Sequence, residues 1–550
     1  MFKTKWGVIK PKNLNEVLRN GNIFPQMWIQ QQLCHNPSTV TDSATEASPS
    51  SWDQAKSFKN IPSMGPLKLL LQFFPGGKYA NLDTSQLVLA IKRDMGPICR
   101  LSGLFGKPGM IMTHNPNDFK TILRNEGIWP ERPNLEGLHY YRTVHRKDFL
   151  EGVEGLLASQ GENWGTFRST VNPIIMQPKN SKLYIQRMSA VNKEFMERIR
   201  EIRSPVNEEV PHTFEQEINH WTLETICLVI LDKKLNLING QGVNPMADQL
   251  LKSLNDAISY SLDVERKPSL WVYYKTPTFN KLMKTFDTVT DIVMGYVEEV
   301  VKRLEEDRQK NIPEKSEDDK SIIEKLIKTD KKIAVIMTMD MLLAGLDTTT
   351  SMFTGLLLCL AKNPEKQQLL RQEVMQLLPQ KDSEFDEKLF KNMPYLRACI
   401  KESLRLYPVS NGSTRHPNEN VILSGYRVPK GVQVNMVFSS LLKDDSLYAR
   451  AQEYLPERWL RSAKKDEELQ KECPLHAFKG RSSFVYLPFG FGTRSCIGRR
   501  IAEMSVEMAV ARLIRKFYVE FHYSTENAFK SLLFNVPNIP LKFQFSDVEK

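Results

Sequence analysis

The sequence contains few cysteines, and none stands in a pattern typical of zinc binding or of a disulfide framework. Seven cysteines occur in 550 residues, an odd number without a CxxC pair, which argues against a disulfide scaffold, a zinc finger and a thioredoxin-type site. Glycine and proline, at 27 and 31 residues, are too rare for a collagen-like or low-complexity chain. Such a cysteine-poor chain suits a reducing compartment.

Signatures of nucleic-acid binding are also missing, although the net charge is +11. No RNP, zinc-finger or helix-turn-helix pattern is present. The densest run of charges, residues 302–332, holds ten basic and nine acidic residues and therefore has almost no net field. We expect no nucleic-acid partner, and the positive charge leaves an anionic membrane or an acidic protein as the expected partners.

The first 40 residues are basic and contain five lysines and arginines but a single acid. A stretch rich in serine and threonine follows at Ser38–Ser51. This composition is typical of an organelle transit peptide, with a disordered basic tail as the alternative. No apolar run of 18 residues occurs there, so no N-terminal membrane anchor is predicted. We expect a transit peptide or disordered segment at 1–50 and one folded domain at 51–550.

Three apolar segments raise the question of membrane contact. Met341–Leu360 has a single charge, Asp347, which would cost about 2.5–3.5 kcal/mol at the centre of a bilayer. We therefore predict a long helix buried in a soluble domain. Residues 67–74 and 270–274 are shorter, and they either lie in a membrane interface without crossing it or pack in the core.

Helical periodicity dominates from about Ser181 to Leu406, whereas strand-like alternation is sparse and clusters near residues 96–112, 421–437 and 517–545. No repeat and no Gly/Ser linker interrupts the chain after residue 60. We predict one large domain that is mainly α, with small β-sheets near both ends (α+β).

The strongest chemical signal is a cysteine flanked by glycines, in the segment Phe489–Gly498 (FGFGTRSCIG). Glycines allow the backbone to turn tightly around the sulfur of Cys496. Backbone N–H groups and the start of a helix near Arg499 favour a thiolate there, and Arg494 adds a cation. The alternative is a buried, inert cysteine in a turn.

This segment resembles the haem-binding signature of the cytochrome P450 superfamily of haem-thiolate monooxygenases. Further family motifs recur in the expected order, and together the matches cover nearly all of residues 60–545. They are Trp164-Gly-Thr-Phe-Arg168, Ala344-Gly-Leu-Asp347-Thr348-Thr, Glu402-Ser-Leu-Arg405 and Pro456-Glu-Arg458-Trp459, the last with tryptophan in place of phenylalanine. The resemblance implies the P450 fold, O₂ activation, oxidation of a small apolar substrate, and haem b with Cys496 as the axial iron ligand.

The motif of the central helix has a physical interpretation. Ala344-Gly345 would thin the helix and leave room for O₂. Thr348 is expected to relay protons, and Asp347 to supply them from solvent, which makes these two residues the candidate catalytic groups. The alternative is a helix whose threonine cluster makes only internal hydrogen bonds.

The remaining motifs suit a structural network and a cofactor pocket. Glu402 and Arg405 lie three apart on one helix face, and Arg458 could pair with the same carboxylate. Such a buried network would hold the cysteine loop in place without taking part in catalysis. The residues expected to contact the haem are Trp164, Arg168, Arg415, Phe489, Arg494 and Gly498.

A transit-like N-terminus without an anchor resembles the mitochondrial branch of the superfamily. That branch receives electrons from a small acidic [2Fe–2S] ferredoxin, which is reduced by its own reductase. We expect a location in the mitochondrion, peripheral to the matrix side of the inner membrane, with the endoplasmic reticulum or another membrane surface as the alternative. The cations expected to dock the ferredoxin, unless they are plain surface charge, are Arg397, Lys401, Arg499 and Arg500.

Two segments, Trp129–Pro133 and Gly152–Gly161, look similar to insect mitochondrial members. Some of these hydroxylate ecdysteroids and others oxidise foreign compounds such as insecticides, and we favour foreign compounds. Substrate contacts are expected from Leu135–Glu162 and from the neighbourhood of Leu250–Tyr274.

Two other functions compete with this interpretation. Gly490-x-Gly492-x-x-Ser495 imitates the phosphate-binding loop of a dehydrogenase, but the third glycine is missing, Pro488 would spoil a central strand, and too few residues follow for a doubly wound sheet. A haem-binding sensor or carrier without turnover is the second alternative. The presence of both Asp347 and Thr348 argues against it.

Overall fold

The computed structural model describes residues 49–103, 108–132, 135–238, 244–265, 270–460 and 484–548. Contacts divide the chain into two units, Met1–Ala55 and Lys56–Lys550, of which the first is described only by helix α3 (Pro49–Gln54). The transit segment predicted at 1–50 lies almost wholly outside the described residues. The remaining helices and strands, from Lys56 onward, belong to the second unit.

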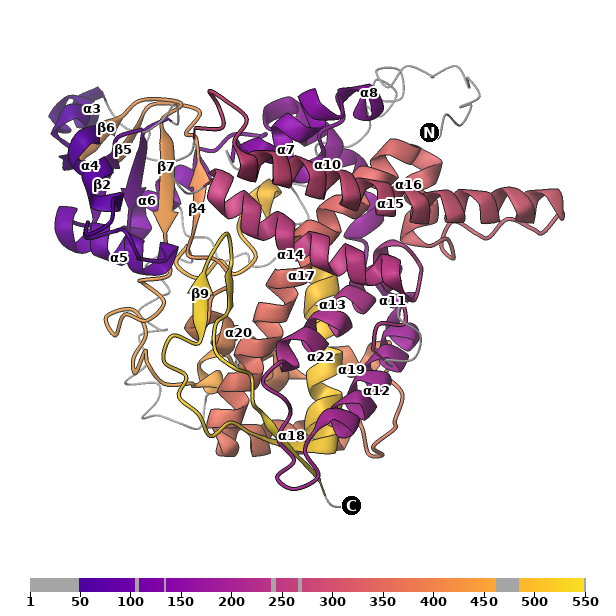
Figure 1. The fold of residues 1–550 in the computed structure, drawn as a ribbon. Helices are drawn as coiled ribbons and strands as arrows, with labels where there is room; N and C mark the ends of the chain where they lie inside the picture. Colours follow the sequence, from indigo (N-terminus) through magenta and orange to yellow (C-terminus); the bar gives the residue numbers. More distant parts are fainter. Residues whose placement is uncertain are drawn as a thin grey trace. The chain divides into compact units, whose positions relative to one another are not determined.

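Helices make up most of the second unit, which confirms the prediction of a mainly α fold (Figure 1). The long helices are α10 (Gly161–Ile175), α12 (Ile185–Ile202), α13 (Phe214–Ile230), α14 (Pro245–Glu265), α15 (Pro277–Gln309), α17 (Lys331–Lys362), α18 (Pro364–Leu377), α20 (Pro394–Leu406) and α22 (Arg499–Lys516). The short helices are α4 (Pro66–Phe73), α5 (Thr84–Met95), α6 (Pro116–Arg124), α7 (Glu136–Tyr140), α8 (Lys147–Leu150), α9 (Gly155–Ala158), α11 (Pro178–Lys182), α16 (Ile322–Thr329) and α19 (Glu387–Lys391). Single turns lie at η1 (Phe58–Asn60), η2 (Tyr141–His145), η3 (Pro456–Trp459) and η5 (Gly492–Arg494).

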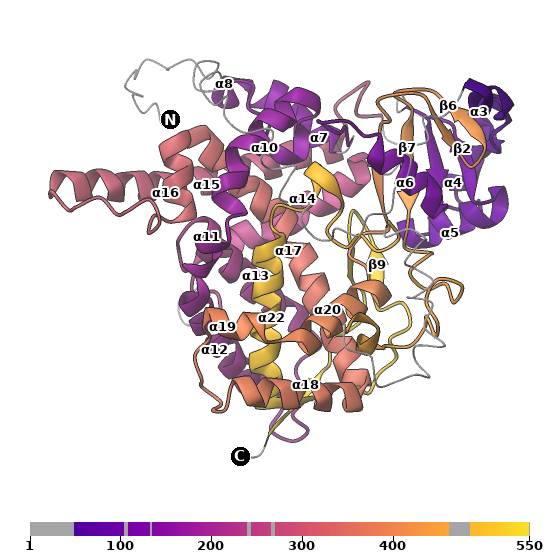
Figure 2. The ribbon, with the colours of Figure 1, turned by 180° about the vertical axis from the view of Figure 1, so that it is seen from behind.

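Helix α17 runs through the middle of this unit, beside α13, α20 and α22 (Figures 1 and 2). The side chain of Asp330 caps its start by accepting hydrogen bonds from the N–H groups of Lys332 and Ile333. Among the described helices, α17 alone is long and apolar enough to cross a membrane, but 78% of its most apolar window is buried in the unit. The segment Met341–Leu360 is therefore part of a buried core helix, as the sequence predicts.

Four small sheets lie in the described residues. The largest has the strand order β1 (Ser63–Met64), β2 (Ile98–Leu101), β3 (Met110–Thr113), β7 (Gln433–Val437) and β4 (Gly412–Arg415). Two-stranded sheets are formed by β5 (Val421–Leu423) with β6 (Tyr426–Val428), β8 (Phe517–Glu520) with β11 (Gln544–Asp547), and β9 (Phe529–Ser531) with β10 (Asn535–Pro537).

Strand β4 is the element that the sequence pattern does not indicate, since Gly-Ser-Thr-Arg has little β-propensity. Its pairing with β7 decides its conformation. Thr414 lies opposite Asn435, and Gly412 lies opposite Val437. Because side chains alternate between the faces of a strand, these four residues share one face of the sheet.

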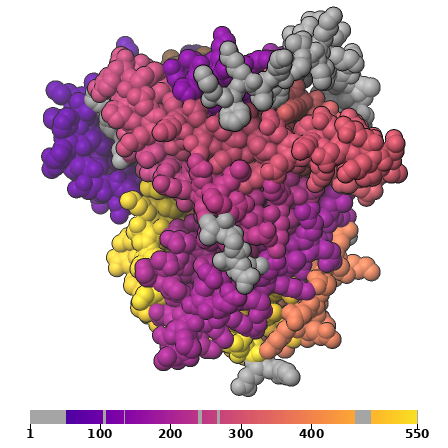
Figure 3. Space-filling model, turned by 45° about the vertical axis from the view of Figure 1, so that its right-hand side comes forward, coloured from indigo at the N-terminus to yellow at the C-terminus, as the bar shows by residue number. Residues whose placement is uncertain are grey.

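The C-terminal end of α15 stands out from the surface of the unit (Figure 3). Its exposed residues include Lys310, directly after the helix. The charges of this end belong to the balanced run that the sequence shows at residues 302–332, so the projection is a solvated helix end.

Candidate active site

The segment Phe489–Gly498 folds into a tight loop that ends at the start of α22. Gly490 and Gly492 adopt φ values of +75° and +65°, in the left-handed region that favours glycine. The N–H of Cys496 donates to the carbonyl of Phe489 at 2.8 Å and closes the loop. Gly498 has an ordinary φ of −82°, and an added Cβ there would meet only ordinary contacts, the nearest at 3.5 Å. The turn therefore requires glycine at the first two positions, and nothing in the geometry requires it at Gly498.

The Cys496 side chain has solvent-accessible area, although the surrounding chain is dense enough to desolvate its thiol. Burial raises the pKa of its thiol, whereas hydrogen bonds from the N–H groups of Gly498 and Arg499 and the charges of Arg168 and Arg132 act in the opposite direction. These donors and cations are the groups that stabilise a sulfur anion. The other cysteines in the described residues are buried.

Four arginines gather around this loop from four distant parts of the chain: Arg132, Arg168, Arg415 and Arg494. Burial and the neighbouring guanidinium groups lower the pKa of Arg494 to about 8. Burial also lowers the pKa of Arg132 and of Arg168 to about 10. The carboxylate that meets this cluster is Glu126, which accepts from Arg415 Nε at 2.5 Å. Cationic charge thus exceeds anionic charge at the cluster.

The arginines differ in how they are held. Arg494 donates to the carbonyl of Pro130 at 2.8 Å and to Gln160 Oε1 at 2.9 Å, and its guanidinium lies 3.9 Å from the ring centroid of Trp164. Arg168 donates to the carbonyl of Ser495 at 2.9 Å, which connects α10 with the cysteine loop, but its buried Nε lacks a partner. The Arg132 guanidinium has no hydrogen-bond partner within the described part of the chain.

These observations test whether the site fits an anionic cofactor. Surplus buried cations and an unsatisfied guanidinium nitrogen are costly unless anionic groups compensate them. A group with two carboxylates and a metal that takes a thiolate would provide that compensation, and haem has both. The residues therefore fit a haem, with Arg132 as an additional contact that the sequence analysis did not identify. Arg132 belongs to the segment Trp129–Pro133 that resembles insect mitochondrial members, but its position in the sequence does not predict that it lies near Cys496.

The predicted hydrogen bonds around Glu402 are present, and Glu402 and Arg405 are both 0% exposed. Arg405 donates to both carboxylate oxygens, at 2.8 and 3.0 Å, and Arg458 Nε donates at 3.0 Å. Trp459 Nε1 adds a donor at 2.8 Å and the N–H of Leu455 another at 3.1 Å. The tryptophan that replaces the family phenylalanine thus contributes a hydrogen bond that phenylalanine cannot make.

On the central helix, Ala344 lines a cavity, and Asp347 and Thr348 follow it within about one helical turn. Thr348 Oγ donates to the carbonyl of Ala344 at 2.7 Å, which leaves its oxygen lone pairs available to accept a proton. Burial raises the pKa of Asp347 to about 6. Glu215 on α13 has a pKa raised to about 7 by burial and by the charge of Asp347, and the sequence shows no signal for it.

Gly345 has a different role from the one that its motif suggests. An added Cβ on this residue would lie 2.8 Å from Ile226 Cδ1 on α13. The residue therefore allows α13 to pack closely against α17. Ala344 lines the cavity.

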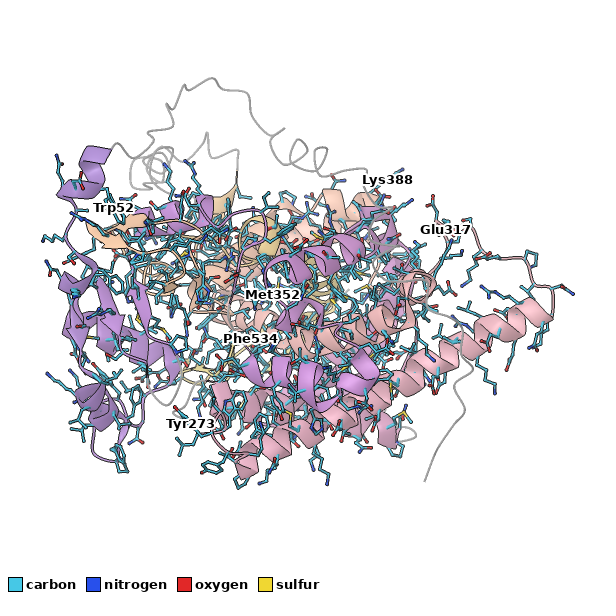
Figure 4. The ribbon with its side chains drawn as sticks, turned by 90° about the horizontal axis from the view of Figure 1, so that it is seen from above. Trp52, Tyr273, Glu317, Met352, Lys388 and Phe534 are labelled. Atoms are coloured by element: carbon cyan, nitrogen blue, oxygen red, sulfur yellow. The ribbon has the colours of Figure 1, made fainter. Side chains whose placement is uncertain are left out.

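The cavity has a volume of about 170 Å³, and slightly more than half of its lining residues are apolar. Both segments expected to contact substrate contribute, the first through Leu135, Leu138 and Leu157 and the second through Ala257, Ile258 and Ser261. The structure adds Gly412–Thr414 of β4 and the turn Ser531–Asn535, which sequence periodicity did not identify. Phe534 of this turn lies in the interior, whereas Tyr273 lies at the margin (Figure 4).

Comparison with known proteins agrees with this geometry. The family model described as cytochrome P450 matches residues 62–545. The chain belongs to the cytochrome P450 family. It is 59% identical to cytochrome P450 CYP12A2 of Musca domestica over 519 residues, with 94% of this chain and 95% of that protein covered. It is 51% identical to the probable mitochondrial cytochrome P450 12a5 of Drosophila melanogaster, with 90% and 92% covered.

Membership confirms three predictions: the family, the mainly α fold and the enzyme class. This P450 is an oxidoreductase of the monooxygenase type, similar to insect CYP12 proteins, and it uses haem with a cysteine thiolate bound to iron. Neither a dehydrogenase nor a carrier without turnover agrees with this result. O₂ and redox partners belong to the reaction of the family.

The cations predicted to dock the electron donor of this P450 are unequally available. Arg397 Nε pairs with Glu507 at 3.1 Å, and Arg499 Nε pairs with Glu503 at 3.1 Å. Arg500 is exposed and has no ion-pair partner in the described residues, and Lys401 is exposed on α20. The pairing of Arg397 with Glu507, 110 residues away, is information that the sequence spacing did not contain.

Proposed function

We propose that this P450 is a mitochondrial monooxygenase that oxidises apolar foreign compounds, with haem b as its cofactor and an acidic [2Fe–2S] ferredoxin and its reductase as its electron source. The observation that supports the substrate class most directly is the cavity, in which leucine is the most frequent lining residue and slightly more than half of the lining residues are apolar. Bound haem supplies the oxygen-activating chemistry, because its thiolate ligand donates electron density that favours O–O cleavage.

The residues of this chain hold the haem and move protons in the proposed reaction. Cys496 would provide the thiolate ligand of the haem, and Phe489 and Trp164 would pack beside it. Arg132, Arg168, Arg415 and Arg494 would bind the haem carboxylates, and the Glu402 network would hold the cysteine loop. Thr348 and Asp347 form the proton path from solvent to the cavity.

An endogenous ecdysteroid is a second candidate substrate, which one feature of the cavity favours. Asn411, Thr414 and Asn435 place amide and hydroxyl groups in the wall, and such groups suit the hydroxyls of a polar steroid. Titration of the purified holoenzyme with an organophosphate insecticide and with ecdysone distinguishes the candidates through the spin-state shift of the haem. A spin-state shift with the insecticide alone supports the first function, and a shift with ecdysone alone contradicts it.

We predict that Asp347→Asn lowers kcat by roughly a hundredfold and leaves KM nearly unchanged. The variant removes the proton source without altering the shape of the cavity, and positioned proton transfer is worth about 10²–10⁴ in rate. Turnover supported by ferredoxin, together with its solvent isotope effect, provides the measurement. A matched Glu215→Gln variant shows whether the second carboxyl belongs to the path. An unaltered kcat in Asp347→Asn would eliminate this role.

The raised pKa of Asp347 also predicts a pH-dependent stability difference. Between pH 4 and 6 the native state keeps this proton while the unfolded state, with an ordinary pKa, has released it. The contribution of Asp347 to the free energy of unfolding therefore falls as pH rises through this window and stays low above it. Urea unfolding should show a larger advantage of Asp347→Asn over the parent at pH 7.5 than at pH 4.5.

Docking of the ferredoxin is proposed on the face that presents Lys401 and Arg500. We expect Lys401→Glu and Arg500→Glu each to slow ferredoxin-supported turnover by about tenfold and to flatten its dependence on salt, because rim charges mainly affect association. Peroxide-driven turnover, which needs no ferredoxin, should not change. Lys310→Glu, at the projecting end of α15, is the control of equal charge. Equal effects of all three charge reversals would refute a specific docking face.

We propose that the enzyme resides in the mitochondrion, peripheral to the matrix side of the inner membrane, with residues 1–50 as a transit peptide and 51–550 as the enzyme domain. The basic, acid-poor N-terminus supports this location, as does the description of the 12a5 relative as mitochondrial. Leu67 and Leu71 of α4 are 70% and 56% exposed, and Tyr273 is 68% exposed. Such apolar groups suit an interfacial contact, which flotation with anionic vesicles can test.

A further inference from the structure

The segment Leu135–Ala158, which contains α7, α8 and α9, forms one wall of the cavity through Leu135, Leu138 and Leu157. A buried ion pair holds the second half of this segment against the central helix. Arg142 Nη2 lies 2.7 Å from Asp340 Oδ1 on α17, and the two side chains are 0% and 3% exposed. A buried pair of this kind adds little net stability because of its desolvation cost. Its main effect is therefore expected on the position of the wall.

Asp340 binds the backbone of the wall as well as the arginine. Its Oδ2 accepts hydrogen bonds from the N–H of Leu156 at 2.6 Å and from the N–H of Leu157 at 3.3 Å. Arg142 Nη1 donates to the carbonyl of Glu154 at 2.5 Å. The N–H groups of Leu156 and Leu157 have no partner inside the short helix α9, because the first N–H groups of any helix lack one. A carboxylate of α17 therefore fixes the position of the backbone at Leu157.

Gly155 allows this close approach. Its φ is +77°, and an added Cβ would lie 2.5 Å from Arg142 Nη1, 2.5 Å from Ile336 Cγ2 and 2.6 Å from Asp340 Oδ2. No side chain fits at this position without separating the wall from the helix, and the positive φ disfavours one as well.

The position of Asp340 on α17 connects this contact with the reaction. Ala344 lies one helical turn further along the same face, and it lines the cavity together with Leu157. The same carboxylate thus determines how far the Leu157 wall stands from the part of α17 that precedes Asp347 and Thr348. Tyr141, next to Arg142, hydrogen-bonds Asp287 on α15 at 3.0 Å, so the wall is also attached to a second helix.

We propose that Asp340 and Arg142 are positioning residues that set the depth of the cavity beside Ala344 and thereby determine which ligands fit over the haem. This inference rests on the proposed function, because it assumes that haem and substrate share this cavity. Neither residue contacts the reacting atoms; both act through the position of Leu157.

Titration of holoenzyme variants with two azoles tests the proposal. Imidazole is small, and 4-phenylimidazole must use the space next to the Leu157 wall, so the ratio of their dissociation constants reports the depth of the cavity. We expect Asp340→Asn and Gly155→Ala each to change this ratio by about tenfold, or about 1.4 kcal/mol, mainly through 4-phenylimidazole. The matched control is Asp118→Asn. The carboxylate of Asp118 is also buried, at 3% exposed, and it accepts a hydrogen bond from the N–H of Ser424 at 2.7 Å.

The control should lose stability and keep the parental ratio. A parental ratio in both folded variants would overturn the proposal. If neither variant folds, hydrogen exchange of the parent holoenzyme provides the test. We expect the amides of Leu156 and Leu157 to be protected from exchange. Exchange at the rate of free amides would contradict the contact with Asp340. Failure of the parent to bind either azole would instead count against the proposed haem cavity.

Discussion

Replacing Cys496 with serine is expected to abolish monooxygenase turnover and the thiolate-type band of the reduced, carbon monoxide-bound enzyme. A serine hydroxyl does not ionise at neutral pH, so the donors at Gly498 and Arg499 would face a neutral oxygen that cannot replace a thiolate. The loss should be at least about 10³-fold in rate, since removal of the group that supports the chemistry raises the barrier by several kcal/mol.

The control for this prediction is Cys99→Ser, in β2, whose thiol is buried and does not line the cavity. We expect this variant to lose about 1–3 kcal/mol of stability because a hydroxyl is buried, and to keep the spectrum and turnover of the parent. A parental carbon monoxide spectrum in Cys496→Ser would show that the iron ligand has been assigned to the wrong residue.

Replacing Glu402 with glutamine is expected to lower the free energy of unfolding by about 3–5 kcal/mol and to reduce the haem content of the purified protein. The carboxylate meets five donors, from Arg405, Arg458, Trp459 and the N–H of Leu455. An amide would leave two buried guanidinium groups without a counter-charge, which costs far more than an exposed pair is worth. Denaturant unfolding of the apoprotein and absorbance of the holoenzyme provide the measurements.

Two neighbouring variants make this prediction sharper. Glu453→Gln removes an ion pair with Arg450 in which both side chains are about half exposed, and it should cost at most about 1 kcal/mol. Trp459→Phe removes one donor and restores the family residue, and it should cost about 1 kcal/mol. Equal destabilisation by Glu402→Gln and Glu453→Gln would contradict the importance assigned to the buried network.

Local patterns in the sequence were sufficient for the cysteine loop and for part of the Glu402 network. The loop is contiguous, so its glycines, its cysteine and the start of α22 are visible in ten residues. Glu402 and Arg405 lie on one helix face through the helical repeat alone. Arg458 was expected from its motif, whereas the hydrogen bond of Trp459 depends on how η3 packs against α20.

Long-range contacts could not be obtained in this way. The approach of Ile226 to Gly345 shows that a glycine within a catalytic motif can serve helix packing, which periodicity does not reveal. Glu215 joins Asp347 only because α13 and α17 pack together. Strand β4 has little intrinsic preference for extended structure, and its neighbour β7 decides its conformation.

The amino-acid order by itself determined the helix-rich class, the tight cysteine loop and the family motif of the central helix, because turn chemistry and helical spacing act over a few residues. The tertiary structure alone decided that Arg132 approaches Arg494 and Cys496, that Glu507 engages Arg397, and that Asp340 meets Arg142. Each of these contacts joins residues far apart in the chain, and such contacts form only when the core brings distant elements together.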